Sequence, residues 1–218
     1  MSKRMPTLVP NRKIIEPKTE AQAYYQDLIK SNDVTLCTGP AGCGKTFVPT
    51  LMAVEDFLLN KVSKIVLVRP AVEAGGEKLG FLPGDLLSKM DPFLGPIFDA
   101  MNEVWQNERI EEMIHKGEIE VVPLAYMRGR TFNYSFILTD EAQNMTEDQM
   151  LMLLTRIGKE SKMVISGDLQ QNDLGTKHSS GLVRALKLVG KVDSIASMEF
   201  TAEDCVRNPV IIDILKNW

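Results

Sequence analysis

The pattern G-x-x-x-x-G-K-[ST] is met at every fixed position by Gly39-Pro40-Ala41-Gly42-Cys43-Gly44-Lys45-Thr46. A β-like run precedes it at residues 34–38, and apolar residues at helical spacing follow it at positions 53, 54, 57 and 58. This order of strand, glycine-rich loop and helix is typical of a loop that binds the phosphates of a nucleoside triphosphate, because backbone N–H groups close around phosphate where a Cβ would intrude. The alternative is a glycine-rich strand-to-helix turn without a ligand.

The side chains of this loop have distinct predicted roles. Lys45 is expected to reach the β- and γ-phosphates, and Thr46 to place its hydroxyl on Mg²⁺. Cys43 lies near the N-terminus of the following helix, whose positive dipole end favours a thiolate that bound phosphate would cover. Alternatively, position 43 needs only a small residue. The residues predicted to bind nucleotide in this loop are Gly39, Pro40, Ala41, Gly42, Cys43, Gly44, Lys45 and Thr46.

Two adjacent acids follow another apolar run about ninety residues further on, in Tyr134-Ser135-Phe136-Ile137-Leu138-Thr139-Asp140-Glu141. Unpaired charge beside a core is strongly disfavoured, so this arrangement suggests that cations meet the carboxylates. We assign Asp140 to the metal and Glu141 to the base that orients the attacking water. A solvated turn after a strand is the alternative.

A third apolar run, at residues 162–166, leads into a polar stretch that contains Asp168 and Gln171. An amide can hydrogen-bond phosphate and water together without adding a charge that must be desolvated. Gln171 is therefore the predicted sensor of the γ-phosphate.

With these motifs the chain resembles the PhoH family of P-loop ATPases, whose core is similar to that of superfamily 1 helicases. The resemblance extends from about residue 14 to the C-terminus. It depends on the phosphate loop, on Gly167-Asp168 with Gln171, and on two longer segments, Asp140-Glu141-Ala142-Gln143-Asn144 and residues 69–85. Leu169 and Asn208 depart from the family pattern, which usually has proline and histidine there.

The resemblance implies roles for two further residues. Gln22 stands where such proteins bind the adenine edge, and a glutamine amide can pair with N6 and N7 of adenine; a solvent-facing helix glutamine is the alternative. Arg207 matches an arginine that could stabilise transition-state charge on the γ-phosphate, in cis or across a subunit interface.

The whole chain has the length and composition of one α/β domain. It has 218 residues, is 44% hydrophobic, and contains no run of the roughly twenty apolar residues that a membrane span needs. Apolar strands are predicted near residues 34–38, 64–69, 119–123, 134–139, 162–166 and 195–200, with room for helices between them. We expect a mostly parallel sheet flanked by helices. The resemblance implies that this sheet is RecA-like, with the 162–166 strand between the strands that precede the phosphate loop and Asp140.

The ends, cysteines and histidines add less. Residues 1–13 form a short basic arm, and residues 14–218 the predicted ATPase domain. The arm lacks the apolar stretch of a secretory signal, and the three cysteines have no C-x-x-C spacing, so we expect a reducing cytoplasmic environment. We assign neither His115 nor His178 to a metal. A helix-like stretch from Leu86 to Trp105 is expected to pack in the core or at an interface.

The net charge of −4 is not typical of a protein with a broadly basic, nucleic-acid-binding surface. Any such contact must be local, and Arg128 and Arg130 lie beside Tyr126 in one loop. Arginine and tyrosine together suit single-stranded nucleic acid. A solvated turn or a subunit contact is equally compatible with this loop.

The leading hypothesis is an Mg²⁺-dependent ATPase that acts on RNA or single-stranded DNA, and unwinding is one form that this action could take. We expect it to work as a homo-oligomeric ring, with a hexamer as the suspected form. In it Lys45, Glu141, Gln171 and Arg207 are catalytic, and Thr46 and Asp140 hold the metal. The rival is a slow ATP-gated conformational switch that acts on a protein partner. Both hypotheses use the same pocket.

Overall fold

The computed structural model of the protein describes residues 15–69, 86–171 and 180–206, with the backbone alone for residues 86–93. The predicted basic arm, most of the segment 69–85, and Arg207 lie outside these residues. Among the described helices, none combines the length and apolar composition that a bilayer crossing requires.

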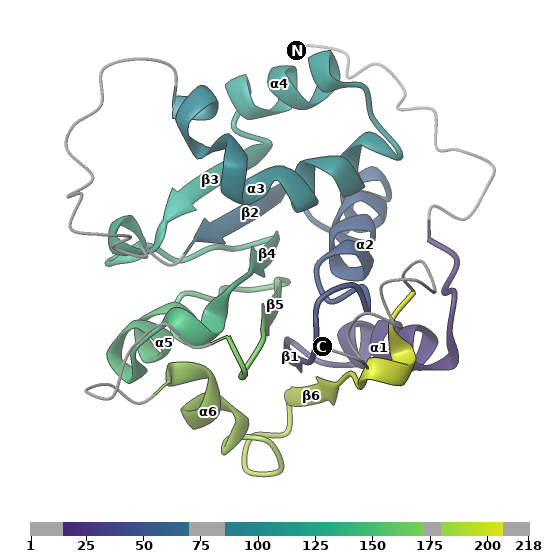
Figure 1. The fold of residues 1–218 in the computed structure, drawn as a ribbon. Helices are drawn as coiled ribbons and strands as arrows, with labels where there is room; N and C mark the ends of the chain where they lie inside the picture. Colours follow the sequence, from purple (N-terminus) through teal and green to yellow (C-terminus); the bar gives the residue numbers. More distant parts are fainter. Residues whose placement is uncertain (1–14, 70–85, 172–179, 207–218) are drawn as a thin grey trace.

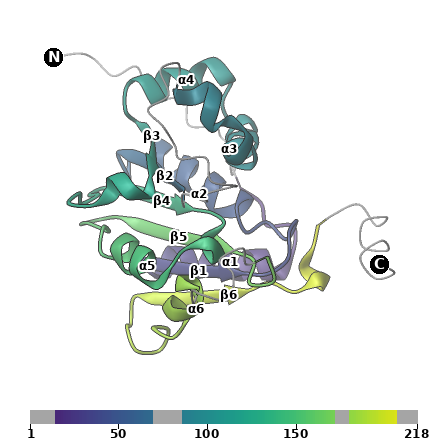
Figure 2. The same cartoon turned by 60° about the vertical axis from the view of Figure 1, so that its left-hand side comes forward.

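A six-stranded, all-parallel sheet forms the centre of the molecule (Figures 1 and 2). Its strands are β1 Val34–Thr38, β2 Lys64–Arg69, β3 Ile119–Pro123, β4 Ser135–Thr139, β5 Lys162–Gly167 and β6 Ile195–Glu199. They lie in the order β3-β2-β4-β5-β1-β6. The six strand predictions and the parallel-sheet prediction are therefore confirmed, and β5 does lie between β1 and β4.

Helices cover both faces of this sheet (Figure 2). The α-helices are α1 Glu20–Ser31, α2 Phe47–Leu58, α3 Leu86–Asn102, α4 Asn107–His115, α5 Glu147–Leu154 and α6 Gly181–Leu186. Three short 3-10 helices are η1 Leu124–Met127, η2 Ala142–Asn144 and η3 Ala202–Asp204.

Each face of the sheet has its own hydrophobic core, because successive side chains of a strand point to opposite faces. In β2, Ile65 and Leu67 belong to the core with α1 to α4, whereas Val66 and Val68 belong to the core with α5 and α6. Strands buried on both faces explain why the sequence showed continuous apolar runs rather than alternation.

The stretch predicted as a helix from Leu86 is α3, and its described apolar side chains belong to the core. Leu94, Ile97 and Met101 are buried against α2 and the sheet. Burying side chains of this size stabilises the fold by about 1.5 to 3 kcal/mol each. This part of the stretch therefore packs within the domain.

Candidate nucleotide-binding site

Three loops meet at one edge of the sheet because the strands are parallel and β1, β5 and β4 are neighbours. The glycine-rich loop leaves β1, the acidic pair leaves β4, and Gly167-Asp168 ends β5. In open α/β sheets, ligands bind at the carboxyl ends of the strands. The topology thus brings the three predicted motifs together.

Two glycines of the loop are required by its geometry. Gly39 has φ +136°, and a Cβ there would lie 2.5 Å from the carbonyl oxygen of Phe200. Gly44 has φ +96°, and a Cβ there would lie 2.8 Å from the Gln22 side chain. Both residues combine a positive φ with close packing, which only glycine tolerates.

The start of α2 is supported by a tyrosine of α1. Pro49 lies in the first turn of α2 and has no N–H, so the Lys45 carbonyl lacks its usual partner four residues on. Tyr25, which is fully buried, donates its hydroxyl to that carbonyl at 3.2 Å. The backbone of the loop lysine is thereby fixed from outside the loop.

The Lys45 ammonium points back over the loop that precedes it. It donates to the carbonyls of Gly39 and Pro40 at 2.6 and 2.7 Å. A phosphate group offers a stronger, anionic partner for the same ammonium. Phosphate binding by Lys45 remains a prediction.

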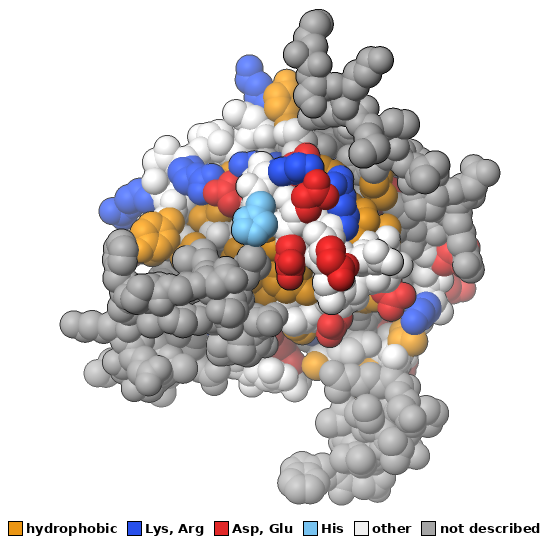
Figure 3. Space-filling view, turned by 90° about the horizontal axis from the view of Figure 1, so that it is seen from above, with side chains coloured by type: hydrophobic (Ala, Val, Ile, Leu, Met, Phe, Trp, Pro, Cys, Tyr) orange, Lys and Arg blue, Asp and Glu red, His pale blue; other side chains and the backbone are white. Residues whose placement is uncertain are grey.

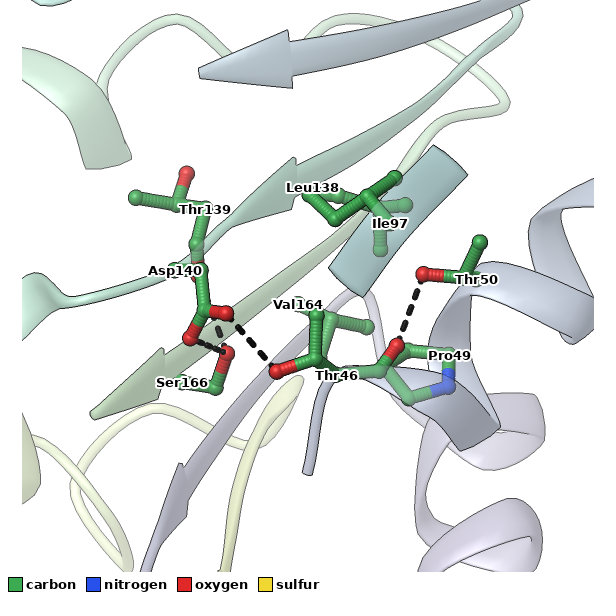
Figure 4. Close-up of a pocket in the computed structure, with 9 residues that line it drawn as sticks. All are labelled: Thr46, Pro49, Thr50, Ile97, Leu138, Thr139, Asp140, Val164 and Ser166. Carbon is green, nitrogen blue, oxygen red and sulfur yellow. Dashed lines mark hydrogen bonds between the residues drawn. The ribbon is translucent and has the colours of Figure 1, made fainter. Parts of the chain in front are cut away.

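Thr46 and Asp140 are in direct contact, as Figure 4 shows. The Thr46 hydroxyl donates to Asp140 Oδ2 at 2.7 Å, and Ser166 at the end of β5 donates to Oδ1 at 2.8 Å. The two predicted metal ligands, 94 positions apart in the chain, therefore lie side by side.

This donor set fits Mg²⁺. The hydroxyl and carboxylate oxygens are hard ligands, and Mg²⁺ is usually held by one or two protein groups together with substrate phosphates. Within the described ranges, no three His, Cys, Asp or Glu side chains cluster as an all-protein metal cage would need. Bound there, Mg²⁺ would neutralise phosphate charge.

Glu141 lies just beyond this contact in a left-handed backbone conformation, with φ 55° and ψ 32°. Its exposed carboxylate accepts a hydrogen bond from Gln143 Nε2 at 2.7 Å. The Gln143 side chain is fully buried, and its Oε1 accepts the Asp168 backbone N–H at 3.0 Å. Gln143 therefore links the predicted base to the end of β5.

Arg69, at the end of β2, is electrostatically coupled to the same glutamate. Burial lowers the pKa of the Arg69 guanidinium, and the Glu141 carboxylate opposes that shift. A cation therefore lies within electrostatic reach of the predicted base.

Gln22 is buried, so the alternative of a solvent-facing helix residue is wrong. Its Nε2 donates to the Cys43 carbonyl at 3.1 Å, and its Oε1 accepts the Lys18 N–H at 2.9 Å. Both ends of the amide are engaged with the protein itself. Contact with adenine stays a prediction.

The prediction of a Cys43 thiolate is wrong. Cys43 has no exposed surface, and this burial raises the pKa of its thiol to about 12; the Cys205 thiol, whose sulfur lies 2.8 Å away, adds to the rise. Desolvation and a neighbouring thiol outweigh the opposing field of Lys45. The thiol of Cys43 is neutral at physiological pH.

Gln171 follows β5 and donates its side-chain amide to Asp168 Oδ2 at 3.1 Å. Asp168 is therefore hydrogen-bonded to two glutamines: its side chain accepts from Gln171, and its backbone N–H donates to Gln143. A sensor role for Gln171 and a catalytic role for Arg207 both stay predictions.

The two candidate nucleic-acid arginines differ in their surroundings. Arg130 pairs with Glu120 at 2.6 Å and lies over the Phe132 ring at 4.5 Å. Arg128 is exposed, as is Tyr126; the predicted loop is in part the 3-10 helix η1, which contains Tyr126, follows β3 at its carboxyl end and is directly followed by Arg128. Arg130 is thus engaged within the chain, and contact of either arginine with nucleic acid stays a prediction.

The face over α4 mixes both charges. Both acidic and basic side chains lie there (Figure 3), and Arg109 pairs with Glu112 within the helix. Such pairs are solvated and favour no polyanion. The described residues of this face therefore carry both signs of charge.

Sequence reasoning assigned no role to Tyr25, Arg69, Gln143 or Ser166. The sequence did hold a sign of a polar role for Ser166, since this hydroxyl ends an apolar strand two residues before Asp168. Gln143 appeared only as part of a motif, and its polar neighbours suggest a turn rather than a buried side chain.

Comparison with known proteins gives a consistent result. The sequence model of a family described as "PhoH-like protein" matches residues 14–218. A "PhoH-like protein" of Synechocystis sp. is 47% identical over 205 residues, covering 94% of this chain and 62% of the relative. One of Bacillus subtilis is 45% identical over 206 residues, covering 94% and 64%. The chain spans less than two thirds of the length of these curated relatives.

Among solved structures, the large terminase from a thermophilic bacteriophage is similar, with a TM-score of 0.61 and 13% identity. The match covers 93% of this chain and 50% of the terminase. At this identity the likeness concerns the fold alone, and the fold is that of a P-loop NTPase.

Proposed function

The chain belongs to the PhoH family of P-loop NTPases, and from that membership and the site geometry we propose that it is an Mg²⁺-dependent ATPase. The observation that supports this most is the 2.7 Å hydrogen bond between Thr46 and Asp140. It joins the phosphate loop to the acid at the end of β4, as a shared metal site requires.

The proposed mechanism divides the work among named side chains. Lys45 and the loop amides bind the phosphates, and Thr46 and Asp140 are the residues that would hold Mg²⁺. Glu141 accepts a proton from, or orients, the attacking water, and Gln143 holds the Glu141 carboxylate in place. Gln171 senses loss of the γ-phosphate, and Arg207 stabilises charge that develops during transfer.

We further propose that hydrolysis is coupled to RNA or single-stranded DNA. The support is local: Tyr126, in η1, and Arg128, directly after it, are both exposed at the carboxyl end of β3, the end of the sheet that carries the site. An arginine for the phosphates and a ring for stacking are the two groups that single strands need. A homo-oligomeric ring would allow one RecA-like domain to complete its site with a neighbour's residues.

ATPase rates measured with and without RNA and single-stranded DNA test this proposal, on material of known mass in solution. Nucleic acid should raise turnover in the parent. Arg128→Ala should weaken nucleic-acid binding and lower the slope of log affinity against log salt by about one. Arg184→Ala, at another exposed arginine, is the matched control.

Slow turnover that no nucleic acid changes would contradict the coupling and favour an ATP-gated switch for a protein partner. Absence of any hydrolysis in the full-length protein would contradict the ATPase proposal itself.

A further inference from the structure

Cys43 and Cys205 are 162 positions apart in sequence, yet their sulfurs lie 2.8 Å from each other. Cys43 is in the phosphate loop and fully buried, whereas Cys205 is partly exposed. Both thiols are free. A disulfide bond is about 2.05 Å long, so a small approach of the two sulfurs would bring them to bonding distance.

The backbone around the two cysteines fixes this proximity. The Phe200 N–H donates to the Thr38 carbonyl at 2.8 Å, just before the loop begins. The Val206 N–H donates to the Gly42 carbonyl at 3.2 Å, one residue before Cys43. The segment 200–206, which contains η3 (Figure 1), is therefore bound to the loop on both sides of Cys205.

Between these two bonds, η3 sets the direction of Cys205. The Thr201 N–H and hydroxyl both donate to Asp204 Oδ2, at 2.7 and 2.9 Å, which closes the short turn. The Thr201 carbonyl faces the Cys43 sulfur at 3.5 Å. The thiol pair is thus held by a small rigid element and does not depend on two freely rotating side chains.

We propose that Cys43 and Cys205 are an oxidation site, which peroxides convert into an intramolecular disulfide that disables the phosphate loop. The effect on the loop rests on the proposed function as a nucleotide site, whereas formation of the disulfide does not. The oxidant is a hydroperoxide, with hydrogen peroxide as the simplest member of the class.

The chemistry takes place in two steps. The Cys205 sulfur, the accessible one, attacks one peroxide oxygen; the O–O bond breaks, and a sulfenic acid and one water result. The Cys43 sulfur then attacks the Cys205 sulfur, the S–O bond breaks, and the hydroxyl leaves as water with the Cys43 proton. In sum, two thiols and one hydrogen peroxide give one disulfide and two waters, with the sulfurs oxidised and the peroxide oxygens reduced.

A disulfide here would restrict the loop at a critical point. Cys43 lies between Gly42 and Gly44, whose positive φ values shape the loop, and its carbonyl is already held by Gln22 at 3.1 Å. Phosphate binding requires the amides on both sides of Cys43 to converge on phosphate oxygens. A disulfide bond from Cys43 to Cys205, in the segment 200–206, would hinder these amides from moving into the positions that phosphate binding requires.

The test oxidises the full-length protein with hydrogen peroxide, blocks remaining thiols, and identifies linked peptides by mass. Affinity for a fluorescent ATP analogue is measured before and after oxidation and after reduction with dithiothreitol. The variants are Cys205→Ser, which removes the accessible thiol, and Cys37→Ala, which removes the third cysteine and leaves the pair intact.

We expect the parent and Cys37→Ala to form a Cys43–Cys205 link, to lose about tenfold in nucleotide affinity, and to recover it on reduction, while Cys205→Ser keeps its affinity throughout. No linked peptide, a link only in covalent dimers, or a link without loss of affinity would overturn the inference. If the reduced parent binds nucleotide but does not hydrolyse it, the ATPase proposal fails. The disulfide and nucleotide-affinity measurements still test the oxidation proposal in that case.

Discussion

At the scale of single residues, Glu141 has an unusual backbone. A residue with a side chain rarely adopts a positive φ, and holding it there costs about 1 to 3 kcal/mol. Here the Glu141 N–H donates to Asp140 Oδ1 at 3.0 Å, and its carboxylate is bound by Gln143. Such strain persists only where surrounding contacts enforce it, and these two hydrogen bonds are contacts of that kind.

Glu141→Gln should therefore preserve ATP binding and nearly abolish turnover. The amide keeps the size and hydrogen-bonding reach of the side chain but removes the anionic group that activates water. Lys45→Ala should instead weaken binding itself. Equilibrium binding and single-turnover rates separate the two effects, and hydrolysis by Glu141→Gln within a few-fold of the parent rate would show that another group is the base.

Gln143→Met should lower kcat by about tenfold or more with little change in nucleotide affinity. Methionine fills the same volume but releases the Glu141 carboxylate and leaves the Asp168 N–H without its acceptor, which also destabilises the fold by about 1 to 3 kcal/mol. Gln106→Met, at an exposed glutamine, is the matched control. A loss of stability with unchanged kcat would mean that Gln143 is structural and does not position the base.

For residues that belong to a local sequence pattern, the sequence predicted which side chains the structure brings together, while their roles stay predictions. The contact of Thr46 with Asp140 agrees with their shared assignment: Thr46 ends the glycine-rich loop that follows β1, and Asp140 directly follows β4. Gln143 and Cys43 were different: one bonds to a backbone group 25 positions away, and the other meets a thiol 162 positions away. Local spacing carries no information about such partners, and for Cys43 the dipole argument failed because burial was unknown.

At the scale of elements, the predicted phosphate loop depends on α1, a helix that packs beside the sheet. Thr19 caps this helix by accepting the Gln22 N–H at 3.1 Å, and the helix then presents Gln22 and Tyr25 to the loop. Tyr25 also meets the Phe200 ring edge-on at 5.4 Å. α1 therefore joins the start of the fold to the loop and to the segment after β6.

Tyr25→Phe should lower stability by about 1 to 2 kcal/mol and weaken nucleotide binding. The ring packing survives this change, but the Lys45 carbonyl loses the donor that replaces the missing N–H of Pro49. Tyr24→Phe is the matched control, since Tyr24 is 58% exposed and Tyr25 is fully buried. Thermal unfolding and ATP titration measure both effects; equal behaviour of the two variants would contradict a role for the tyrosine hydroxyl.

The elements themselves were predictable because nearly all strands are apolar on both faces. The predicted strands 134–139, 162–166 and 195–200 differ from β4, β5 and β6 by one residue at one end. What sequence periodicity did not supply is the support between elements, such as the hydrogen bond from the Tyr25 hydroxyl to the Lys45 carbonyl. That contact depends on how α1 packs, which tertiary structure determines.

At the scale of the whole molecule, the described chain contains a single sheet with one phosphate loop. A single RecA-like domain offers half of a hydrolytic site, and a neighbouring subunit can supply the other half in a closed ring. The alternative is that the arginine comes from the same subunit. The Val206 N–H donates to the carbonyl of Gly42 in the phosphate loop of the same chain, and Arg207 is the next residue in sequence. Whether the arginine acts in trans or in cis decides whether assembly is needed for activity.

Mixing two inactive variants tests this directly. Arg207→Ala chains keep the phosphate loop, and Lys45→Ala chains keep the arginine, so each should be nearly inactive alone. If the arginine acts in trans, a random equal mixture should recover activity at about one quarter of its interfaces, where an intact loop meets an intact arginine. We expect this recovery, measured as ATPase rate after subunit exchange has been verified by mass. No recovery despite verified exchange, or full activity of the parent as a dilute monomer, would contradict action in trans. Arg207 would then act within its own subunit, in keeping with the hydrogen bond between Val206, the residue before it, and Gly42 of the phosphate loop.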